Sequence, residues 1–162
     1  MSDRVHVTFV CSGNICRSPM AEKMFAHQIA DRGLAERVRV SSAGTGGWHA
    51  GDAADSRARK VLEAHGYPSD HVAAQVGDDH LAADLVIALG RNHMRLLTQL
   101  GVEPERVRML RSFDPRSARH PLDVEDPYYG GMTDFEDVFT VIEAALPGLH
   151  GWIDDRLEGH AP

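Results

Sequence analysis

Residues 11–19 read Cys11-Ser12-Gly13-Asn14-Ile15-Cys16-Arg17-Ser18-Pro19, and they join an apolar run, Val5 to Val10, to a segment with helical spacing, Ser18 to Arg32. A short loop between a buried strand and the start of a helix forms an anion site, because successive backbone N–H groups point inward and the helix dipole adds positive potential. In this loop five residues separate a thiol, Cys11, from a planar cation, Arg17. The segment can therefore bind a phosphate group and also attack it.

The rest of the chain alternates strand-like and helix-like segments. Strands are expected at residues 5–10, 37–43, 84–89 and 107–110, where apolar and β-branched residues are concentrated. Helices are expected at residues 18–32, 55–65, 91–100 and 134–157. The first helix has Ser18 as its expected N-cap, Pro19 at its first position and Gly33 as its stop. This order predicts an α/β fold: one three-layer α/β/α domain over residues 1–162, with a four-stranded parallel sheet of the Rossmann or flavodoxin type.

A long loop, residues 111–131, precedes the last expected helix and contains three prolines. Loops of this length inside a small domain usually carry function. Ligands of parallel sheets bind at the carboxyl ends of the strands. We therefore expect this loop to fold over the loop that follows the first strand.

Composition excludes several classes of protein. The chain has 162 residues, 43% of them hydrophobic, which suits one domain with one core. Its net charge of −7 argues against a nucleic-acid partner, and it shows no signal-peptide pattern and no membrane-spanning apolar stretch. Two cysteines are too few for a disulfide scaffold or a zinc site, and the histidines lack metal-ligand spacing. We expect a cytoplasmic protein with no metal, no cofactor and no membrane partner; no pattern indicates its oligomeric state.

Cleavage of a phosphate monoester needs a cationic cradle, a nucleophile and a proton for the leaving group. The loop N–H groups and Arg17 supply the cradle, because the guanidinium fork makes bidentate hydrogen bonds to phosphate oxygens. Cys11 supplies the nucleophile, since a helix N-terminus and a nearby cation stabilise a thiolate, and Ser18 could donate a hydrogen bond to the sulfur. Asp126 supplies the proton: like charge from a bound dianion favours the protonated carboxyl, which can later deprotonate the attacking water. Pro127 restricts the backbone of Asp126 and helps to fix its direction.

Two motifs, Cys11-x4-Cys16-Arg17-Ser18-Pro19 and Asp126-Pro127-Tyr128-Tyr129, resemble those of the low-molecular-weight protein tyrosine phosphatases. The similarity covers essentially the whole chain, and its intermediate matches are Ser42-Ala43-Gly44-Thr45, Trp48, Gly51, Asp55 and Arg57. The combination is far more specific than a bare Cys-x5-Arg pattern. Independently of the resemblance, the two tyrosines after Pro127 could form the wall of a pocket that stacks an aromatic leaving group.

The resemblance implies a role for each matching residue. It implies a phosphocysteine intermediate on Cys11, binding of the substrate and the transition state by Arg17, and general acid and base catalysis by Asp126. It implies phosphate or substrate contacts from Ser12, Gly13, Asn14, Ile15, Cys16, Ser18, Trp48, Tyr128 and Tyr129. It also implies that Asn14 holds the loop in a strained turn through hydrogen bonds involving Ser42 and His71. Finally, it implies a reversible disulfide between Cys16 and Cys11 that shields the nucleophile from irreversible oxidation.

Simpler explanations remain open for several loop residues. Cys16 could be a small residue packed at the base of the helix, Ser18 only an N-cap, and Asn14 a plain turn residue. Asp126 could be a turn former before Pro127.

Other residues of the motifs also have structural explanations. Trp48 and Tyr128 could be partly buried packing residues, and Ser42 only the end of a strand. His71 could be a satisfied core or loop histidine. Asp55 and Arg57 could be an ion pair at a helix start.

We therefore predict a protein-tyrosine phosphatase that hydrolyses phosphotyrosine in proteins and small aryl phosphates, and that phosphate-like oxyanions inhibit. One alternative is an arsenate reductase of the same architecture, but its thiol-relay forms need redox cysteines after Cys16 and the chain has none. The other alternative is a non-catalytic phosphotyrosine-binding module. That module would require the loss of Cys11, Arg17 or Asp126, and all three are present.

Overall fold

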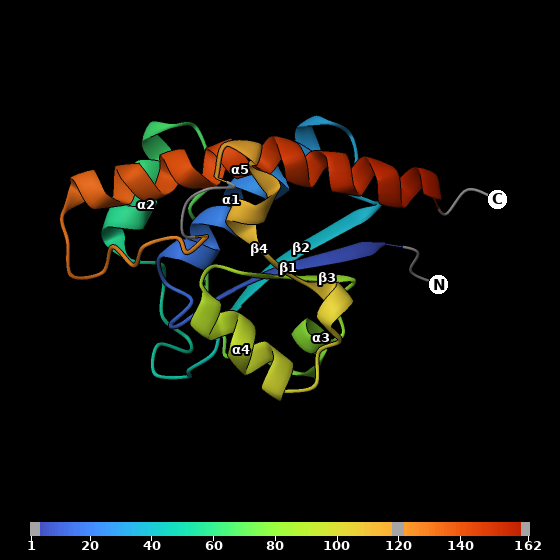
Figure 1. Cartoon of the computed structure of the whole chain (residues 1–162). Coiled ribbons are helices and arrows are strands. Elements are labelled where there is room, and N and C mark those ends of the chain that lie inside the picture. The colour runs from blue at the N-terminus through green and yellow to red at the C-terminus, as the bar shows by residue number, and fades with distance from the viewer. Residues whose placement is uncertain (1–3, 118–121, 160–162) are drawn as a thin grey trace.

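Four parallel strands form a single sheet at the centre of the molecule (Figure 1). The computed structural model describes residues 4–117 and 122–159. The strands are β1 (Val5–Cys11), β2 (Val38–Gly44), β3 (Leu85–Ala88) and β4 (Val107–Met109), in the spatial order β2-β1-β3-β4. All three neighbouring pairs are parallel. The chain leaves β1 toward β2 on one side and later returns to β3 on the other, so the loop after β1 lies where ligands of such sheets bind.

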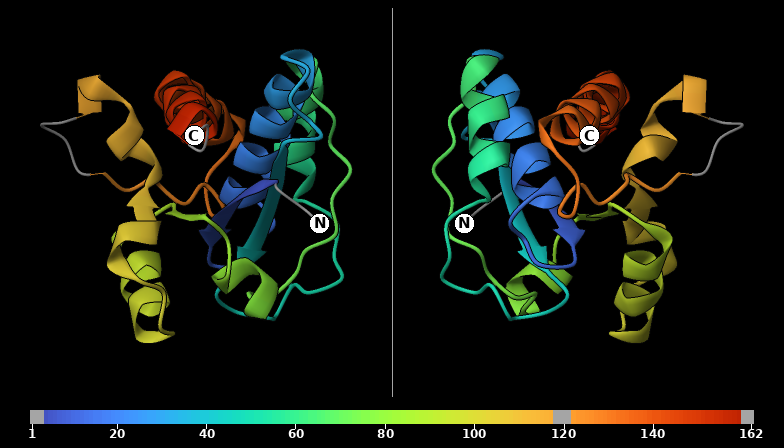
Figure 2. Two further views of the ribbon diagram at one scale, coloured as in Figure 1. Left: turned by 90° about the vertical axis from the view of Figure 1, so that its right-hand side faces the viewer. Right: turned by 90° about the vertical axis from the view of Figure 1, so that its left-hand side faces the viewer.

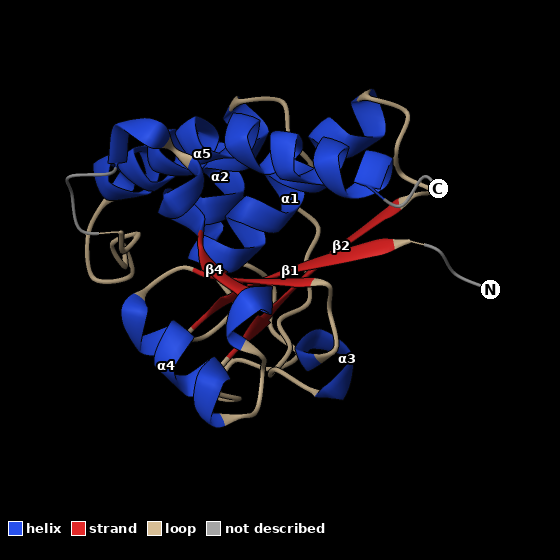
Figure 3. Cartoon of the chain, turned by 45° about the vertical axis from the view of Figure 1, so that its right-hand side comes forward, coloured by secondary structure: helices blue, strands red, loops and turns tan. Residues whose placement is uncertain are grey.

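Helices cover both faces of the sheet and complete three layers (Figures 1 and 3). One layer consists of α1 (Arg17–Asp31), α2 (Ser56–Ala64) and α5 (Met132–Gly159). The opposite layer consists of α3 (Asp78–Leu81) and α4 (Arg91–Gln99), and Figure 2 shows the two groups on either side of the strands. The expected three-layer α/β fold with a four-stranded parallel sheet is confirmed. Within the described ranges, no helix is both long and apolar enough to cross a membrane.

Alternate residues of β1 enter two separate hydrophobic cores. Val7 and Phe9 pack in the larger core beneath α1 and α5, where the Phe9 and Phe25 rings meet edge to face with centroids 6.1 Å apart. Val10 packs in the smaller core with Leu97 of α4. A strand buried on both faces is held firmly. The residue at its end, Cys11, is therefore carried on a strand that packing holds in place.

The structure differs from the sequence expectations in three places. The short helix α3 was not expected, because four residues are too few to show a helical period. The loop at 111–131 is not structureless: it contains 3₁₀ turns at Leu110–Phe113 and Pro115–Ser117, while residues 118–121 lie outside the described ranges. The start of α1 also differs, and that difference matters for the site.

Candidate active site

The helix α1 begins at Arg17, two residues before Pro19, the expected first helical position. Its N-cap is Cys16, whose side chain makes no capping hydrogen bond, so Ser18 is not the N-cap and Pro19 is not the first helical residue. Both predictions were wrong because the Ser18 hydroxyl has other partners. This hydroxyl is fully buried and lies 2.9 Å from Cys11 Sγ.

The backbone carbonyls of the loop between β1 and α1 point away from its centre. Four of them accept a hydrogen bond from outside the loop: Cys11 from the N–H of Thr45 (2.8 Å), Ser12 from that of Gly46 (3.0 Å), Asn14 from the His71 ring (2.8 Å) and Ile15 from the N–H of Asp55 (2.8 Å). In contrast, no backbone N–H of residues 12–16 has an acceptor among the described residues. With the carbonyls held outward, these N–H groups are left for an anion above Cys11.

Asn14 holds this loop in its shape. Its backbone is left-handed (φ 61°), the only such non-glycine residue in the described chain. Its side-chain amide donates to Ser18 Oγ (2.8 Å) and Ser42 Oγ (2.9 Å), and its Oδ1 accepts from the backbone N–H of Ala74 (2.9 Å). His71 donates its Nε2–H to the Asn14 carbonyl, and burial lowers the pKa of His71, which leaves the ring neutral at pH 7. The hydrogen bonds expected of Asn14 with Ser42 and His71 are thus present.

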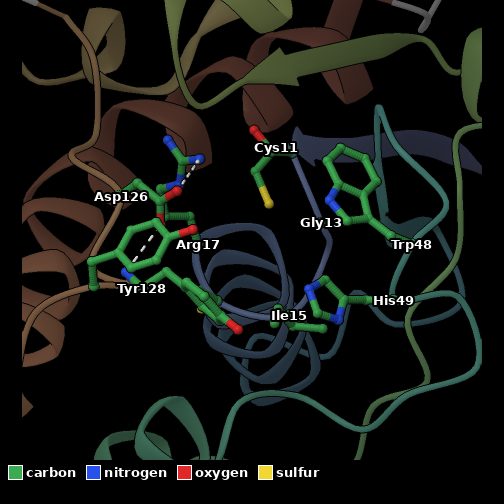
Figure 4. Close-up of a pocket in the computed structure, with 11 residues that line it drawn as sticks. Cys11, Gly13, Ile15, Arg17, Trp48, His49, Asp126 and Tyr128 are labelled. Carbon is green, nitrogen blue, oxygen red and sulfur yellow. Dashed lines mark hydrogen bonds and ion pairs between the residues drawn. The ribbon is translucent and has the colours of Figure 1, made fainter.

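The same network fixes the direction of the bond between Ser18 and Cys11. The Ser18 hydroxyl accepts from Asn14, so its own proton is left to point at Cys11 Sγ. A hydroxyl that donates to sulfur stabilises a negative charge there. Cys11 itself is only 3% exposed and lies at the floor of the pocket (Figure 4).

Arg17 and Asp126 face each other at one side of the pocket (Figure 4). Arg17 is buried, and its Nη1 donates to the carbonyl of Val124 (3.0 Å) while its Nη2 lies 3.6 Å from Asp126 Oδ2. The N–H of Val124 in turn donates to the carbonyl of Leu89, the residue after β3 (2.7 Å). Asp126 is about half exposed and accepts from the N–H of Tyr128 (3.1 Å), so it forms a turn as well as facing the pocket.

Arg57 connects the loop that carries Asp126 to the start of α2. It makes an ion pair with Asp55 (2.9 Å) and donates to the carbonyls of Tyr128 (2.9 Å) and Gly130 (2.8 Å). Its guanidinium also lies over the ring of Phe135, 4.5 Å from the centroid. The expected ion pair at a helix start exists, but its reach to the Asp126 loop was not expected, since 71 or more residues separate the partners.

Aromatic side chains surround the mouth of the pocket, which has a volume of about 370 Å³. Its lining residues are Cys11, Ser12, Gly13, Ile15, Cys16, Arg17, Trp48, His49, Asp126, Tyr128 and Tyr129. Trp48 and Tyr129 are 70% and 95% exposed, so neither is a core packing residue. The rings of Tyr128 and Tyr129 meet edge to face with centroids 5.0 Å apart. Figure 4 shows Trp48 and His49 on the side opposite Asp126.

Cys16 also lines the pocket but is buried and differs from Cys11 in its surroundings. Burial, and next the negative charge of Asp55, raise the pKa of the Cys16 thiol well above its ordinary value. Cys16 is therefore a neutral thiol at pH 7. Both cysteines are free in the structure.

Most of the residues singled out in the sequence come together here. Four of them do not line the pocket but are joined by hydrogen bonds that support the loop: Asn14, Ser18, Ser42 and His71. Sequence reasoning missed His49 in the rim and His93, whose Nε2 lies 2.9 Å from Ser12 Oγ. Neither histidine belongs to a spacing pattern, so no local signal could have identified them.

This arrangement can bind a dianion against inward N–H groups and a buried guanidinium, directly above a sulfur atom. A carboxyl, that of Asp126, stands at one side of the pocket, and aromatic rings at its mouth can stack on a bound aryl group.

A family model described as low molecular weight phosphotyrosine protein phosphatase matches residues 6–159. The chain is 72% identical to low molecular weight protein-tyrosine phosphatase A of Mycobacterium tuberculosis, across 100% of this chain and 99% of that protein. It also resembles the crystal structure of a protein tyrosine phosphatase from Entamoeba histolytica, with a TM-score of 0.85 and 33% identity over 95% of this chain and 97% of that one. A drosophila arginine phosphatase gives a TM-score of 0.82 and 27% identity over 91% and 96% of the two chains.

Proposed function

Because the chain belongs to the low molecular weight phosphotyrosine protein phosphatases and is a protein-tyrosine phosphatase, we propose that it acts through a phosphocysteine intermediate on Cys11. The observation that supports this mechanism most directly is the loop geometry. The N–H groups of residues 12–16 have no acceptor among the described residues, and Arg17 is buried beside them. Such a cradle neutralises a phosphate dianion and lets it approach a nucleophilic sulfur.

In the first step, the Cys11 thiolate attacks phosphorus in line with the ester oxygen, and the sulfur–phosphorus bond forms as the phosphorus–oxygen bond breaks. Arg17 and the loop N–H groups bind the phosphoryl oxygens. Asp126 gives its proton to the departing phenolate. In the second step, Asp126 takes a proton from water, the water attacks phosphorus, and Ser18 stabilises the departing thiolate through its hydrogen bond.

We propose phosphotyrosine in proteins and small aryl phosphates as substrates, because the walls of the pocket are Ile15, Trp48, Tyr128 and Tyr129. Rings of this kind stack on an aryl leaving group. A phosphorylated arginine would instead place a guanidinium group between these rings, and a guanidinium is best bound by carboxylates. Asp126 is the only carboxylate among the lining residues. Side-by-side assays of phosphotyrosine and phosphoarginine peptides test this choice; preferential hydrolysis of phosphoarginine would overturn it.

The general acid role of Asp126 has a specific kinetic signature. Asp126→Asn should lower kcat/KM about a hundredfold or more for phenyl phosphate, whose leaving group needs a proton in the first step. The loss should be much smaller for p-nitrophenyl phosphate, because p-nitrophenolate departs readily without one. The dependence of kcat/KM on leaving-group basicity measures this, because hydrolysis of the phosphocysteine, which both esters share, does not enter kcat/KM. An equal loss for both esters would contradict the assignment.

Cys11→Ser should reduce turnover to background and yet keep the phosphate site, because the N–H cradle and Arg17 remain. Rapid quenching with radiolabelled substrate should trap phosphate on the wild-type protein and none on the variant. Turnover near the wild-type rate in Cys11→Ser would refute the nucleophile. We further propose that vanadate and inorganic phosphate compete for the cradle.

Cys16 is proposed as the partner of Cys11 under oxidation. Peroxide would convert the Cys11 thiolate to a sulfenic acid, and the Cys16 thiol would attack that sulfur to form a disulfide and release water. Peroxide inactivation should then be reversed by dithiothreitol in the wild type and become irreversible in Cys16→Ser. Mass spectra without the disulfide would retire the idea. A function that requires Cys11 reduced suits the reducing cytoplasm, which we propose as the compartment.

An arsenate reductase is not favoured. The family match and the relatives are phosphatases, and the chain has no cysteine after Cys16 for a thiol relay. Release of phosphate without oxidation of an added thiol distinguishes the two reactions.

A further inference from the structure

A buried histidine that the proposed reaction does not use lies directly behind the phosphate loop. His93 is in the first turn of α4 and is fully buried. Its Nε2 lies 2.9 Å from the hydroxyl of Ser12, a residue that lines the pocket. Its Nδ1 has no hydrogen-bond partner among the described residues. This asymmetry between the two ring nitrogens indicates which of them carries a proton.

His93 is a neutral imidazole at pH 7. Burial, and next the positive charge of Arg17, lower the pKa of His93 to about 4. A neutral ring carries one N–H, either on Nδ1 or on Nε2. The bond to Ser12 is compatible with both forms, because a hydroxyl can donate or accept.

The surroundings of Nδ1 favour the form with the proton on Nε2. A Cβ placed on Gly90, the N-cap of α4, would be 3.2 Å from Nδ1, so this nitrogen lies at the N-terminal end of the helix. The N-terminal end of a helix carries positive potential, which favours a bare lone pair there and disfavours an N–H; Asp123, whose Oδ1 accepts from the backbone N–H of Arg91 (2.7 Å), offsets part of this potential. A buried N–H without an acceptor is also the rarer kind of unpaired group. The ring proton therefore belongs on Nε2.

With its proton on Nε2, His93 donates to Ser12 Oγ. The Ser12 hydroxyl then cannot direct its own proton at the ring, and no other side-chain bond to Ser12 exists among the described residues. We propose that His93 is a positioning residue that turns the hydroxyl proton of Ser12 into the pocket, where Ser12 donates a hydrogen bond to the bound phosphoryl group. This inference rests on the proposed function, since it assumes that the pocket binds phosphate.

The direction of the hydrogen bond between His93 and Ser12 decides whether the Ser12 hydroxyl attracts or repels the bound phosphate. In the opposite form Ser12 would donate to His93 and present only lone pairs to a dianion, which repel it. A hydroxyl that donates to a charged oxygen improves binding by roughly tenfold or more. His93 thus acts on the phosphate through Ser12, without touching it.

A double-mutant cycle tests this coupling. The affinity for inorganic phosphate, measured by calorimetry, is the readout, so the test does not depend on turnover. Ser12→Ala and His93→Leu should each weaken binding about tenfold, and the double variant should be no weaker than either single variant, because both remove the same hydrogen bond. A structural role for His93 would instead give losses that multiply to about a hundredfold.

Two further variants separate hydrogen bonding from packing. His93→Gln places an amide N–H near the position of Nε2 and should restore affinity to within about threefold of the wild type. His93→Asn places its amide near Nδ1, cannot reach Ser12, and should stay about tenfold weaker. If His93→Leu does not fold, the comparison of these two amides decides the matter, and equal affinities would overturn the proposal.

The protonated nitrogen can also be observed directly. A long-range ¹H–¹⁵N spectrum of the ring should show the proton on Nε2, and a proton on Nδ1 would overturn the proposal. Failure of the proposed function would look different: p-nitrophenyl phosphate would not be hydrolysed by the wild type, whatever the phosphate affinities of the His93 variants.

Discussion

At the scale of single residues, the site depends on a close approach between β2 and the phosphate loop. Gly44 pairs with Cys11 in the sheet. A Cβ on Gly44 would lie 2.7 Å from the Ser12 carbonyl oxygen, 3.0 Å from the Gly13 carbonyl carbon and 3.1 Å from the Asn14 nitrogen. All three are backbone atoms, so no side-chain rotation can relieve the contact. The absence of a side chain at position 44 lets the loop keep its shape.

Gly44→Ala should therefore displace the loop while leaving the fold intact. We expect a large loss of kcat/KM for p-nitrophenyl phosphate, weaker phosphate binding, and a cost of about 1–3 kcal/mol in the free energy of unfolding from overpacking. Steady-state kinetics and urea denaturation measure these effects.

Gly151→Ala is the matched control, because nothing lies within 4 Å of its added Cβ on the exposed side of α5. It should keep full activity and gain up to about 1 kcal/mol of stability from helix propensity. Full activity in Gly44→Ala would show that the loop tolerates displacement.

The sequence predicted the local part of the site well, because Cys11 and Arg17 lie on one loop whose ends are a buried strand and a helix. It failed at Ser18, whose residue type suits an N-cap. In the structure the helix starts earlier, and this hydroxyl makes hydrogen bonds with Asn14 and Cys11 instead. Local preference was overruled by a partner on the adjacent strand.

At the scale of elements, α2 joins the phosphate loop to the loop that carries Asp126. The backbone N–H of Asp55, the N-cap of α2, donates to Ile15 in the phosphate loop. Arg57, two residues later, donates to the carbonyls of Tyr128 and Gly130. One helix start thus sets the position of both loops relative to each other.

Arg57→Gln should loosen the Asp126 loop without touching the phosphate loop. We expect kcat/KM to fall on the order of tenfold for phenyl phosphate, because a misplaced acid protonates the leaving group poorly. The loss should be smaller for p-nitrophenyl phosphate, and phosphate affinity should be close to that of the wild type.

Lys60 is an exposed lysine on the same helix, so Lys60→Gln controls for the lost charge. It should change the hydrolysis of neither ester. Equal losses for the two esters in Arg57→Gln would indicate damage to the phosphate loop instead. The sequence suggested only an ion pair between Asp55 and Arg57, because the contact with Tyr128 spans 71 positions and has no local pattern.

At the scale of the whole molecule, burial keeps several histidines neutral. Desolvation is the largest cause that lowers the pKa of each of these rings: His6, His71, His80, His93 and His150. When the pKa of a histidine is lower in the folded state, the unfolded chain binds more protons between the two pKa values. Stability is then complete above the unfolded value, near 6.5, and falls as the pH drops toward the folded value.

The free energy of unfolding should consequently decrease as the pH falls from about 6.5 to 4. His93, with a pKa of about 4, contributes the clearest share, up to about 3 kcal/mol. Urea titrations across this range measure the slope, and His93→Gln should make it less steep.

Asn92→Gln, at an exposed neighbour on α4, should leave the slope unchanged. A slope in His93→Gln equal to that of the wild type would contradict the linkage. The fold class and the layers followed from the order of strands and helices, but which histidines are buried depends on how the layers close. Sequence alone therefore left the acid sensitivity of the protein unseen.

The floor and the rim of the pocket differ sharply in their exposure to solvent. Cys11 is 3% exposed, whereas Trp48 and Tyr129 are 70% and 95% exposed, so the sulfur is buried beneath an exposed aromatic edge. We expect a phosphoserine side chain, which is shorter than that of phosphotyrosine, to bring its phosphate less readily to Cys11 before the peptide that carries it meets the edge. Reach alone would thus disfavour short phosphorylated side chains, before any chemical discrimination begins.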